Sequence, residues 1–562
     1  FAHFSADNVI FSPIETTAAR GQNTMTAKVL PIEEEFALGE TIIDGRSYID
    51  FKDNLGCLSE LFSCFDTHAD NELVIFEDDR YTYRDIADLA ARLANSLTET
   101  HGIGTGDRVG LALPNSPDWI ITFVALASLG ATPVLINARA ADAELTHCLG
   151  STACTFCFAD RSLPVDLPTL GMMPSWDLPT EATSLPQVQR DGSDEALLMF
   201  TSGTTGKPKA ATLNHRGLLS ALKTIRYSSA IIASQMAEQY GIDYETIVQM
   251  RPPPVTLLMF PLFHVSGCHA VFLSALTQGG KVVLMQRWNA ERALQLIERE
   301  KITGFPGVPA MHWDILRLES LKDYDLSSLT TLSVGGQGTA PALLEAIHET
   351  FPSAVLGTGY GMTECNGTVT LNIGEGFLKD PKCSGQMVAT VSGEIRDEAG
   401  KIVPAGNVGE IYVRGISLMS GYANYPNDEV FDSEGWMATG DIGYFDADGK
   451  LYIVDRRTDM VISGGENIYC AEIEQAVERH GTVDECAAFG LADDRLGEKL
   501  AVVVRTLNNQ ALTAEALLDH CAGLLTKHKL PREVFFVSDP LPRNASGKLV
   551  KRQLREQFGG NS

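Results

Sequence analysis

The stretch Met199-Phe-Thr-Ser-Gly-Thr-Thr-Gly-Lys-Pro-Lys209 says most about the fold and chemistry of this chain. It begins as an apolar strand and runs into a turn that is rich in glycine and hydroxyl side chains and carries two lysines. Glycine permits backbone conformations that turn amide N–H groups toward an anion, and hydroxyl and ammonium groups add further donors. The composition favours a phosphate-binding turn, although a flexible surface turn between two strands would look similar.

The spacing within this turn differs from that of a Walker loop. A Walker loop has four residues between its glycines and a Ser or Thr directly after its lysine. Here two residues separate Gly203 from Gly206, and Pro208 follows Lys207. The candidate phosphate-binding residues are Thr201, Ser202, Gly203, Thr204, Thr205, Gly206 and Lys207.

Around this turn the chain alternates between helical and strand patterns. Residues 83–99 and 118–129 have helical apolar spacing, whereas residues 108–113 and 132–136 resemble strands. Interleaving of this kind predicts a layered α/β fold with largely parallel sheets. The pattern leaves an insertion at residues 226–254 without an assigned structure.

The C-terminal part has a different pattern. Residues 410–414 and 450–454 alternate with period two, which predicts a small antiparallel sheet or barrel. Helical and strand patterns over residues 471–537 then predict a separate α+β unit. We therefore predict a large multilayered domain of residues 1–455, with two β-sheets sandwiched by helices plus a small β-barrel, and a small mobile α+β lid of residues 456–562.

Composition limits the class of protein. At 562 residues the chain exceeds what one hydrophobic core usually fills. Its 72 acidic against 44 basic residues give a net charge of −28, which disfavours broad contact with nucleic acid or an anionic membrane. We expect no integral membrane segment, because the longest apolar stretch, residues 119–136, is broken by Gly130 and Pro133 and fits a buried helix followed by a strand.

The cysteines favour a reduced, cytoplasmic protein. Eleven are scattered over the chain without the density of a disulfide scaffold. Cys154 and Cys157 form the only CxxC, within an apolar strand-like run and without a second pair at metal-ligand spacing. They are predicted to be buried structural thiols.

Further glycine-containing segments follow apolar strands, which is where open α/β sheets bind ligands. Val334-Gly-Gly-Gln-Gly338 offers bare backbone to a flat ring, or forms a helix-entry turn. In Gly359-Tyr-Gly-Met-Thr-Glu364, Tyr360 offers an aromatic face and Thr363 a hydroxyl for a phosphate. Glu364 offers a carboxylate suited to Mg²⁺ shared with substrate phosphates.

Three polar segments lie nearer the C-terminus. Asp441, in Ala438-Thr-Gly-Asp-Ile442, can accept two ribose hydroxyl protons or cap its own turn. The charged run at residues 455–467 suits a hinge or an exposed β-turn. Lys548, in Pro542-Arg-Asn-Ala-Ser-Gly-Lys548, can reach into a cleft or stay solvated.

Taken together and in this order, these segments resemble the acyl-adenylate-forming superfamily of acyl-CoA synthetases, aryl-CoA ligases, luciferases and peptide-synthetase adenylation domains. The resemblance runs from about residue 50 to about residue 555. It implies a ligase that uses ATP and Mg²⁺ to activate a carboxylic acid as an acyl-AMP, releases pyrophosphate, and transfers the acyl group to coenzyme A. A homodimer is the candidate assembly.

The resemblance also implies roles for the nucleotide-binding segments. Residues 201–209 match a mobile loop over the β- and γ-phosphates. Thr363 matches the contact to the α-phosphate and Glu364 the Mg²⁺ ligand. Asp441 matches the ribose-binding aspartate, with Arg456 beside it. The adenine side is implied for Gly335, Gly336, Gln337, Thr358, Gly359, Tyr360, Gly361 and Met362.

The remaining roles concern the acid, the thiol and the lid. Lys548 matches the lysine that bridges carboxylate and phosphate oxygens, and His264, in Pro261-Leu-Phe-His264, matches the histidine that lines the acyl channel. Gly464 and Gly465 fall where the pantetheine arm passes. The implied hinge is Thr458, where relatives usually have Asp or Lys.

Alternative interpretations concern the thiol acceptor and turnover. A free-standing adenylation enzyme or fatty acyl-AMP ligase would load a carrier protein, and a regulatory protein would bind nucleotide without turnover. The Gly464-Gly465 segment favours coenzyme A, while Lys548 and Glu364 favour catalysis. The acid is predicted to be apolar or aromatic, that is, fatty or aryl, from the pocket candidates Val265, Met311 and Thr358.

Overall fold

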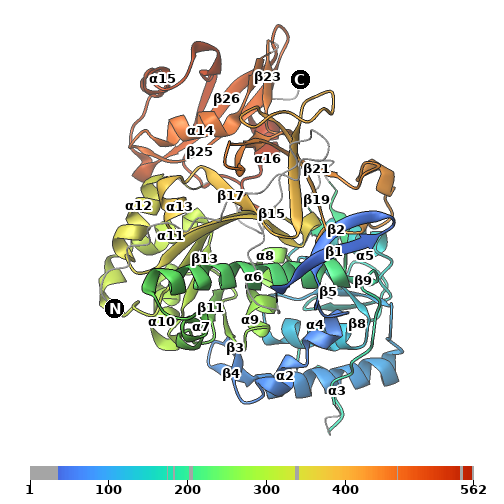
Figure 1. Cartoon of the computed structure of the whole chain (residues 1–562). Helices are drawn as coiled ribbons and strands as arrows, with labels where there is room; N and C mark the ends of the chain where they lie inside the picture. The colour runs from blue at the N-terminus through green and yellow to red at the C-terminus, as the bar shows by residue number, and fades with distance from the viewer. Residues whose placement is uncertain are drawn as a thin grey trace.

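The computed structural model describes residues 36–173, 175–180, 184–201, 207–335, 339, 341–464, 466–544 and 548–559. Two large β-sheets and their helices form the main body of the molecule (Figure 1). A five-stranded sheet near the C-terminus, in orange to red, lies at one end of the molecule, and helix α3 (Tyr83–His101) lies at the other. This arrangement confirms the predicted layered α/β class with an additional C-terminal α+β unit.

The first large sheet has seven strands in the order β20-β10-β9-β6-β5-β7-β8. Strands β8, β7, β5, β6 and β9 pair in parallel, whereas β10 pairs antiparallel with both β9 and β20. The strands are β5 (Arg108–Ala112), β6 (Thr132–Leu135), β7 (Phe156–Ala159), β8 (Thr169–Leu170), β9 (Glu195–Thr201), β10 (Lys209–Asn214) and β20 (Gly421–Tyr422).

The second large sheet has thirteen strands in the order β18-β19-β21-β22-β17-β16-β15-β14-β13-β11-β12-β3-β4. Its middle, from β15 to β3, is parallel, and antiparallel strands extend it at both ends. The strands are β3 (Glu72–Phe76), β4 (Asp79–Thr82), β11 (Val255–Leu258), β12 (Lys281–Leu284), β13 (Gly304–Gly307), β14 (Thr331–Val334), β15 (Val355–Met362), β16 (Gly367–Ile373), β17 (Cys383–Met387), β18 (Val391–Arg396), β19 (Gly409–Gly415), β21 (Met437–Phe445) and β22 (Lys450–Arg456).

The two period-two segments of the sequence are β19 and β22. Both are present as antiparallel strands, and they continue the large sheet at its β18 end. A separate hairpin joins β1 (Leu38–Ile43) to β2 (Arg46–Phe51). The C-terminal sheet contains β23 (Val461–Ser463), β24 (Glu466–Ile468), β25 (Val483–Asp493), β26 (Gly497–Thr506) and β27 (Glu533–Val537).

Helices cover these sheets. Besides α3, the longer ones in the main body are α4 (Pro117–Ser128), α5 (Asp142–Ser151), α6 (His215–Tyr240), α7 (Tyr244–Met250), α10 (Ala290–Glu300), α11 (Pro309–Leu316) and α12 (Pro341–Thr350). The C-terminal unit adds α14 (Cys470–Glu478), α15 (Ala514–Ala522) and α16 (Lys551–Phe558). Short helical segments are α1 (Leu58–Leu61), α2 (Cys64–Thr67), α8 (Val265–Gly267), a π-helix (Cys268–Leu273), α9 (Ser274–Leu276) and α13 (Glu375–Lys379).

Helix α4 lies in the main hydrophobic core. The hydroxyl of Ser116 caps its first turn by accepting from the backbone N–H of Trp119, and Pro117 occupies the first helical turn. All twelve of its residues are buried, as expected of a helix that is apolar on every side. The ring of Trp119 stacks on that of Phe123 with centroids 5.2 Å apart. The predicted buried helix and following strand are confirmed as α4 and β6.

The insertion at residues 226–254 is largely helical. Its first half continues α6, which is capped by Asn214 and ends at Gly241 in the left-handed conformation, with φ of 64°. Asp243 then caps α7 through the N–H of Thr246. Weak apolar periodicity over this segment is the reason why the sequence pattern did not assign it.

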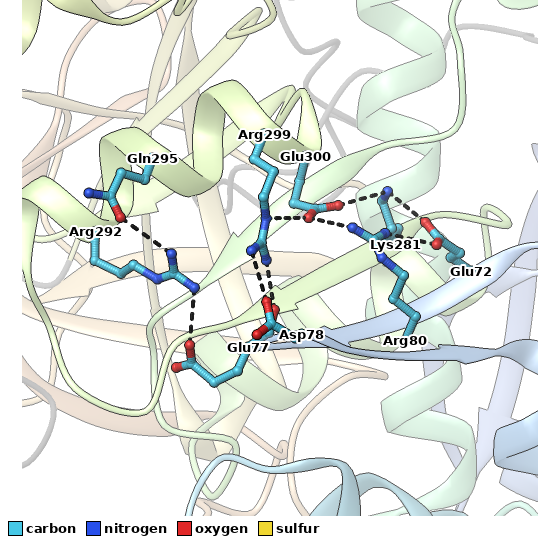
Figure 2. Close-up of polar contacts among 9 residues, drawn as sticks. All are labelled: Glu72, Glu77, Asp78, Arg80, Lys281, Arg292, Gln295, Arg299 and Glu300. Carbon is cyan, nitrogen blue, oxygen red and sulfur yellow. Dashed lines mark hydrogen bonds and ion pairs between the residues drawn. The ribbon is translucent and has the colours of Figure 1, made fainter.

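A network of charges fastens the edge of the thirteen-stranded sheet to α10 (Figure 2). The Glu300 side chain is 2% exposed and accepts from Arg80 over 2.7 Å and from Arg299 over 2.8 Å. Lys281 lies 3.6 Å from Glu300 and 3.0 Å from Glu72. Since α10, β3, β4 and β12 each supply a charge, the network holds four elements together beside one buried carboxylate.

All eleven cysteines are free. Burial raises the pKa of Cys154 to about 11 and that of Cys157 to about 12, which agrees with structural rather than reactive thiols. Across the ranges that the structure describes, no helix combines the length and the apolar character that crossing a bilayer requires.

Candidate active site

The phosphate-binding candidate is the turn between β9 and β10. Thr201 and Lys209 pair across the hairpin and so close the turn at its two ends. Lys207 is exposed on the side that leads into β10. The predicted donors Ser202, Gly203, Thr204, Thr205 and Gly206 lie outside the described residues, so their contact with phosphate stays a prediction.

Three predicted nucleotide-binding side chains, one each from β15, β21 and β22, lie together. The hydroxyl of Tyr360 donates to Oδ2 of Asp441 over 2.6 Å. Arg456, which faces Asp441 in the strand pairing, has its Nε 3.4 Å from Oδ1. The carboxylate of Asp441 therefore points to these two side chains, while the hydroxyl of Thr439 accepts from the backbone N–H of Asp441. In the part of the chain that the structure describes, the printed partners of the Asp441 carboxylate are Tyr360 and Arg456 and not the backbone of its own turn.

The backbone of β15 requires glycine where it approaches β16. A Cβ on Gly361 would lie 1.8 Å from the carbonyl oxygen of Gly367, so no other residue fits there. The strand pairing is irregular between Tyr360 and Gly361. This irregularity leads β15, which also carries the predicted Thr358, Gly359 and Met362, into the turn of Thr363–Cys365.

Glu364 lies in that turn and contacts the other large sheet. Its Oε1 accepts from the hydroxyl of Tyr422 over 2.6 Å, and its backbone carbonyl accepts from Met419 over 2.7 Å. Tyr422 belongs to β20, next to the strand that follows the phosphate-binding turn. The sequence did not predict Tyr422, because an isolated Gly-Tyr pair has no distinctive pattern.

A lone carboxylate fits a metal that arrives with a nucleotide. Among the described residues, no group of three or more His, Cys, Asp or Glu could hold a metal ion by itself. Mg²⁺ commonly binds one or two carboxylates together with substrate phosphates and waters. Glu364, with one oxygen engaged by Tyr422, fits that kind of site.

Lys548 reaches the same place from the far end of the chain. Burial, followed by the positive charge of Arg456, lowers the pKa of Lys548 below its ordinary value, while Asp441 and Glu364 act in the opposite direction. The lysine is therefore within electrostatic range of all three side chains. Its own turn is held by the backbone N–H of Lys548, which donates to Oδ1 of Asn544 over 2.9 Å.

His264 is also within electrostatic range of Lys548. Burial and then the charge of Lys548 lower the pKa of His264 to about 4, so its imidazole is neutral near pH 7. The turn before it is fixed by Asn115, which donates to Phe260 O over 3.0 Å and accepts from Leu262 N over 2.9 Å. Asn115 was not predicted, although its position just after the predicted strand at residues 108–113 is a usable signal.

The other predicted residues have different surroundings. Gly335 follows β14, and a Cβ there would meet no atom of the described residues within 4 Å. Gly336 and Gln337 lie outside the described residues, as does Gly465. Gly464 has φ of 62° and donates its N–H to Leu496 within the C-terminal unit. The described contacts of Gly464 do not connect it to the Asp441 site.

Comparison with known families decides the kind of protein. Residues 62–423, more than half of the chain, match the family described as AMP-binding enzyme. Residues 472–548 match the AMP-binding enzyme C-terminal domain. The chain belongs to the AMP-binding enzyme family. Because these matches leave residues 424–471 between them, the predicted domain boundary between residues 455 and 456 stays a prediction.

Several relatives of this AMP-binding enzyme are CoA ligases. It is 30% identical over 505 residues to 4-coumarate–CoA ligase 2 of Nicotiana tabacum, covering 85% of this chain and 89% of that protein. It is 32% identical over 500 residues to the long-chain-fatty-acid–CoA ligase FadD13 of Mycobacterium tuberculosis, covering 86% and 94%. The solved structure of o-succinylbenzoate CoA synthetase from Bacillus subtilis with its acyl-adenylate intermediate has a TM-score of 0.76 and 28% identity, covering 91% of this chain and all of that one.

These findings confirm the predicted superfamily and activity. The AMP-binding enzyme is an acyl-CoA ligase that forms an acyl-adenylate from a carboxylic acid and ATP and then a thioester with coenzyme A. The Bacillus subtilis synthetase has also been solved with ATP and a magnesium ion, in keeping with the predicted cofactors. Of the three interpretations of the sequence, the coenzyme A ligase is the one confirmed.

Proposed function

We propose that Lys548, Glu364, Asp441, Tyr360 and His264 form one site for ATP and the carboxylic acid of this acyl-CoA ligase. The observation that supports this is the position of Lys548, whose pKa responds to Arg456, Asp441 and Glu364 and which in turn affects His264. These residues come from four separate segments of the chain, since Tyr360 and Glu364 share one. Asp441 and Tyr360 bind the ribose and adenine, and Glu364 binds the cation on the phosphates.

The first half-reaction joins two anions. A carboxylate oxygen of the acid attacks the α-phosphorus of ATP, the new O–P bond forms, and the bond to the β-phosphate oxygen breaks as pyrophosphate leaves. Lys548 lies where positive charge stabilises the developing negative charge, and Thr363 donates its hydroxyl to the α-phosphate. Mg²⁺, when bound at Glu364, supplies further neutralisation of phosphate charge.

The second half-reaction needs space at the acyl carbon. The thiol of coenzyme A attacks the carbonyl carbon of the acyl-AMP, loses its proton, and displaces AMP. Lys548 would obstruct the approaching thiol, so the lid of residues 456–562 moves between the two steps. Thr458 is the proposed hinge. Its carbonyl accepts a 3.1 Å hydrogen bond from Arg555 of α16, close to Lys548 in sequence.

The acid is proposed to be a fatty or aryl carboxylic acid. The named substrates of the relatives span both kinds, from long-chain fatty acids to 4-coumarate. His264 is neutral near pH 7 and adds no charge beside the acyl group. Val265, Met311 and Thr358 stay the predicted pocket residues. The protein is further proposed to be a cytoplasmic homodimer, which sedimentation analysis and cell fractionation would test.

The defining experiment is ATP–pyrophosphate exchange with a panel of acids of graded chain length and ring content. We expect exchange that requires an acid and Mg²⁺, and a thioester product once coenzyme A is added. Exchange without any thioester would support the loading of a carrier protein instead. Tight ATP binding without exchange would support a regulatory protein.

A further inference from the structure

A short segment connects the two large sheets next to the proposed metal ligand. Residues 419–423, which we call the bridging segment, form backbone hydrogen bonds with parts of both large sheets. Met419 donates its N–H over 2.7 Å to the carbonyl of Glu364, in the turn between β15 and β16 of the thirteen-stranded sheet. Tyr422 pairs with Ala211 of β10, on the seven-stranded sheet. The bridging segment therefore sets the position of Glu364 relative to the strand that follows the phosphate-binding turn.

Within the bridging segment, the Tyr422 hydroxyl has two polar partners. It donates to Oε1 of Glu364 over 2.6 Å and is also hydrogen-bonded to Thr201, the first residue of the turn. A phenol with one proton donates it to the carboxylate and accepts from the threonine.

The ring of Tyr422 is held from the other end of the same turn. The Lys209 ammonium lies 5.2 Å from the centroid of the Tyr422 ring and 4.0 Å from that of Tyr425. The two rings meet edge to face, with centroids 6.1 Å apart. A cation over aromatic faces stabilises their orientation. Tyr422 thus contacts both ends of the phosphate-binding turn, Thr201 and Lys209, as well as Glu364.

We propose that Tyr422 is a positioning residue that orients the Glu364 carboxylate toward the divalent cation carried by ATP. Its hydrogen bond engages Oε1 and leaves Oε2 for the cation, while Thr201 and Lys209 tie that orientation to the phosphate-binding turn. The inference rests on the proposed role of Glu364. Outer partners of metal-ligating carboxylates typically contribute ten- to hundredfold in metal affinity or activity.

The test compares two tyrosine variants. Tyr422→Phe removes the hydroxyl and keeps the ring beside Lys209. Tyr425→Phe is the matched control, because the Tyr425 hydroxyl bonds to Glu429 and not to Glu364. Calorimetric titration of ATP is carried out without acid, once with Mg²⁺ and once with EDTA. We expect Tyr422→Phe to weaken ATP binding about tenfold or more with Mg²⁺ and to leave the EDTA value unchanged. Tyr425→Phe should match wild type in both.

Two results would overturn the inference. One is unchanged MgATP binding in Tyr422→Phe, and the other is an equal loss with and without Mg²⁺, which would indicate a purely structural tyrosine. Thermal melts show whether the variant is folded.

A double-mutant cycle with Glu364→Gln measures the coupling between the two side chains independently. In the Glu364→Gln background, Tyr422→Phe should cause no further change in the Mg²⁺ dependence of ATP binding. If ATP binding by Glu364→Gln depends on Mg²⁺ as in wild type, the proposed metal role of Glu364 fails. If Glu364→Gln loses the Mg²⁺ dependence but Tyr422→Phe keeps it, only the positioning role of Tyr422 fails.

Discussion

The hydroxyl of Tyr360 donates a 2.6 Å hydrogen bond to Oδ2 of Asp441, across two strands of the thirteen-stranded sheet that are not neighbours. Burial, followed by the charge of Asp441, raises the pKa of Tyr360 well above its ordinary value, so the phenol remains a donor. Asp441 is 7% exposed. Both oxygens of its carboxylate keep a lone pair that can accept from the two hydroxyl groups of a ribose.

This geometry predicts that Asp441 selects the ribose. Asp441→Asn should weaken ATP binding about ten- to hundredfold, since hydrogen bonds to a charged acceptor contribute about 1.5–3 kcal/mol. The preference of wild type for ATP over 2′-deoxy-ATP should shrink in the variant, because the lost contact is to the ribose hydroxyls. KM values for both nucleotides in the exchange assay measure this. An equal loss for the two nucleotides would contradict a ribose contact.

The lowered pKa of Lys548 predicts the alkaline limit of the reaction. The amine is useful when charged, and burial together with Arg456 makes it lose its proton at a lower pH than an ordinary lysine. The pH dependence of kcat/KM for ATP reports the pKa values of groups in the free enzyme. We expect kcat/KM to fall with rising pH, with a midpoint below about 10.4, the ordinary pKa of lysine.

Lys548→Arg is the control for that assignment. A guanidinium stays charged throughout this range, so the variant should lose the alkaline decline even if its rate is lower. An unchanged alkaline decline in Lys548→Arg would mean that another group titrates.

The buried carboxylate of Glu300 predicts a stability effect (Figure 2). Glu300→Gln leaves Arg80, Arg299 and Lys281 without their shared partner. Breaking a buried ion pair from one side typically costs about 3–5 kcal/mol, so the melting temperature should fall by several degrees. Glu345→Gln, on an exposed position of α12, should melt as wild type does. Equal melting temperatures for the two variants would show that the network contributes nothing.

The raised pKa of Asp455, at the end of β22, predicts that the free energy of unfolding depends on pH. Burial raises its pKa to about 6, while Lys551 opposes the shift and Glu474 and Asp459 support it. Because the folded pKa exceeds the ordinary value of about 3.9, this carboxyl stabilises the fold fully below pH ~4, and the contribution disappears as pH rises through about 6. Two pKa units correspond to about 3 kcal/mol.

Asp455→Asn removes this titration. The melting temperature of the variant relative to wild type should therefore rise between pH 4 and pH 7. Parallel melting curves over that range would contradict the raised pKa.

Sequence patterns identified the separate parts of the nucleotide site. The period of the apolar residues was sufficient for α3, α4 and β6. Tyr360 and Asp441 were recognisable because glycines at strand ends mark ligand sites, and Lys548 because of the small flexible residues before it. These residues lie close together because of the strand order in the thirteen-stranded sheet and the placement of the C-terminal unit. Local sequence patterns encode neither of these.

The residues that sequence missed act through long-range contacts. Tyr422 matters because β20 pairs with β10 while the neighbouring Met419 bonds to Glu364. Asn115 matters because it fixes a turn about 145 residues further along the chain. The contact of Tyr422 leaves no pattern in the sequence, and the position of Asn115 after a predicted strand marks the residue but not its partner.

The most direct test of the account separates the two half-reactions of Lys548→Ala. In one rapid-quench experiment, enzyme, ATP and acid form acyl-AMP; in the other, pre-formed acyl-AMP and coenzyme A form the thioester. If Lys548 stabilises the adenylation transition state and leaves the site before the thiol attacks, adenylation should fall on the order of 10²-fold or more, while thioester formation stays within a few-fold of wild type. Equal losses in both steps, or full adenylation without this lysine, would contradict the account.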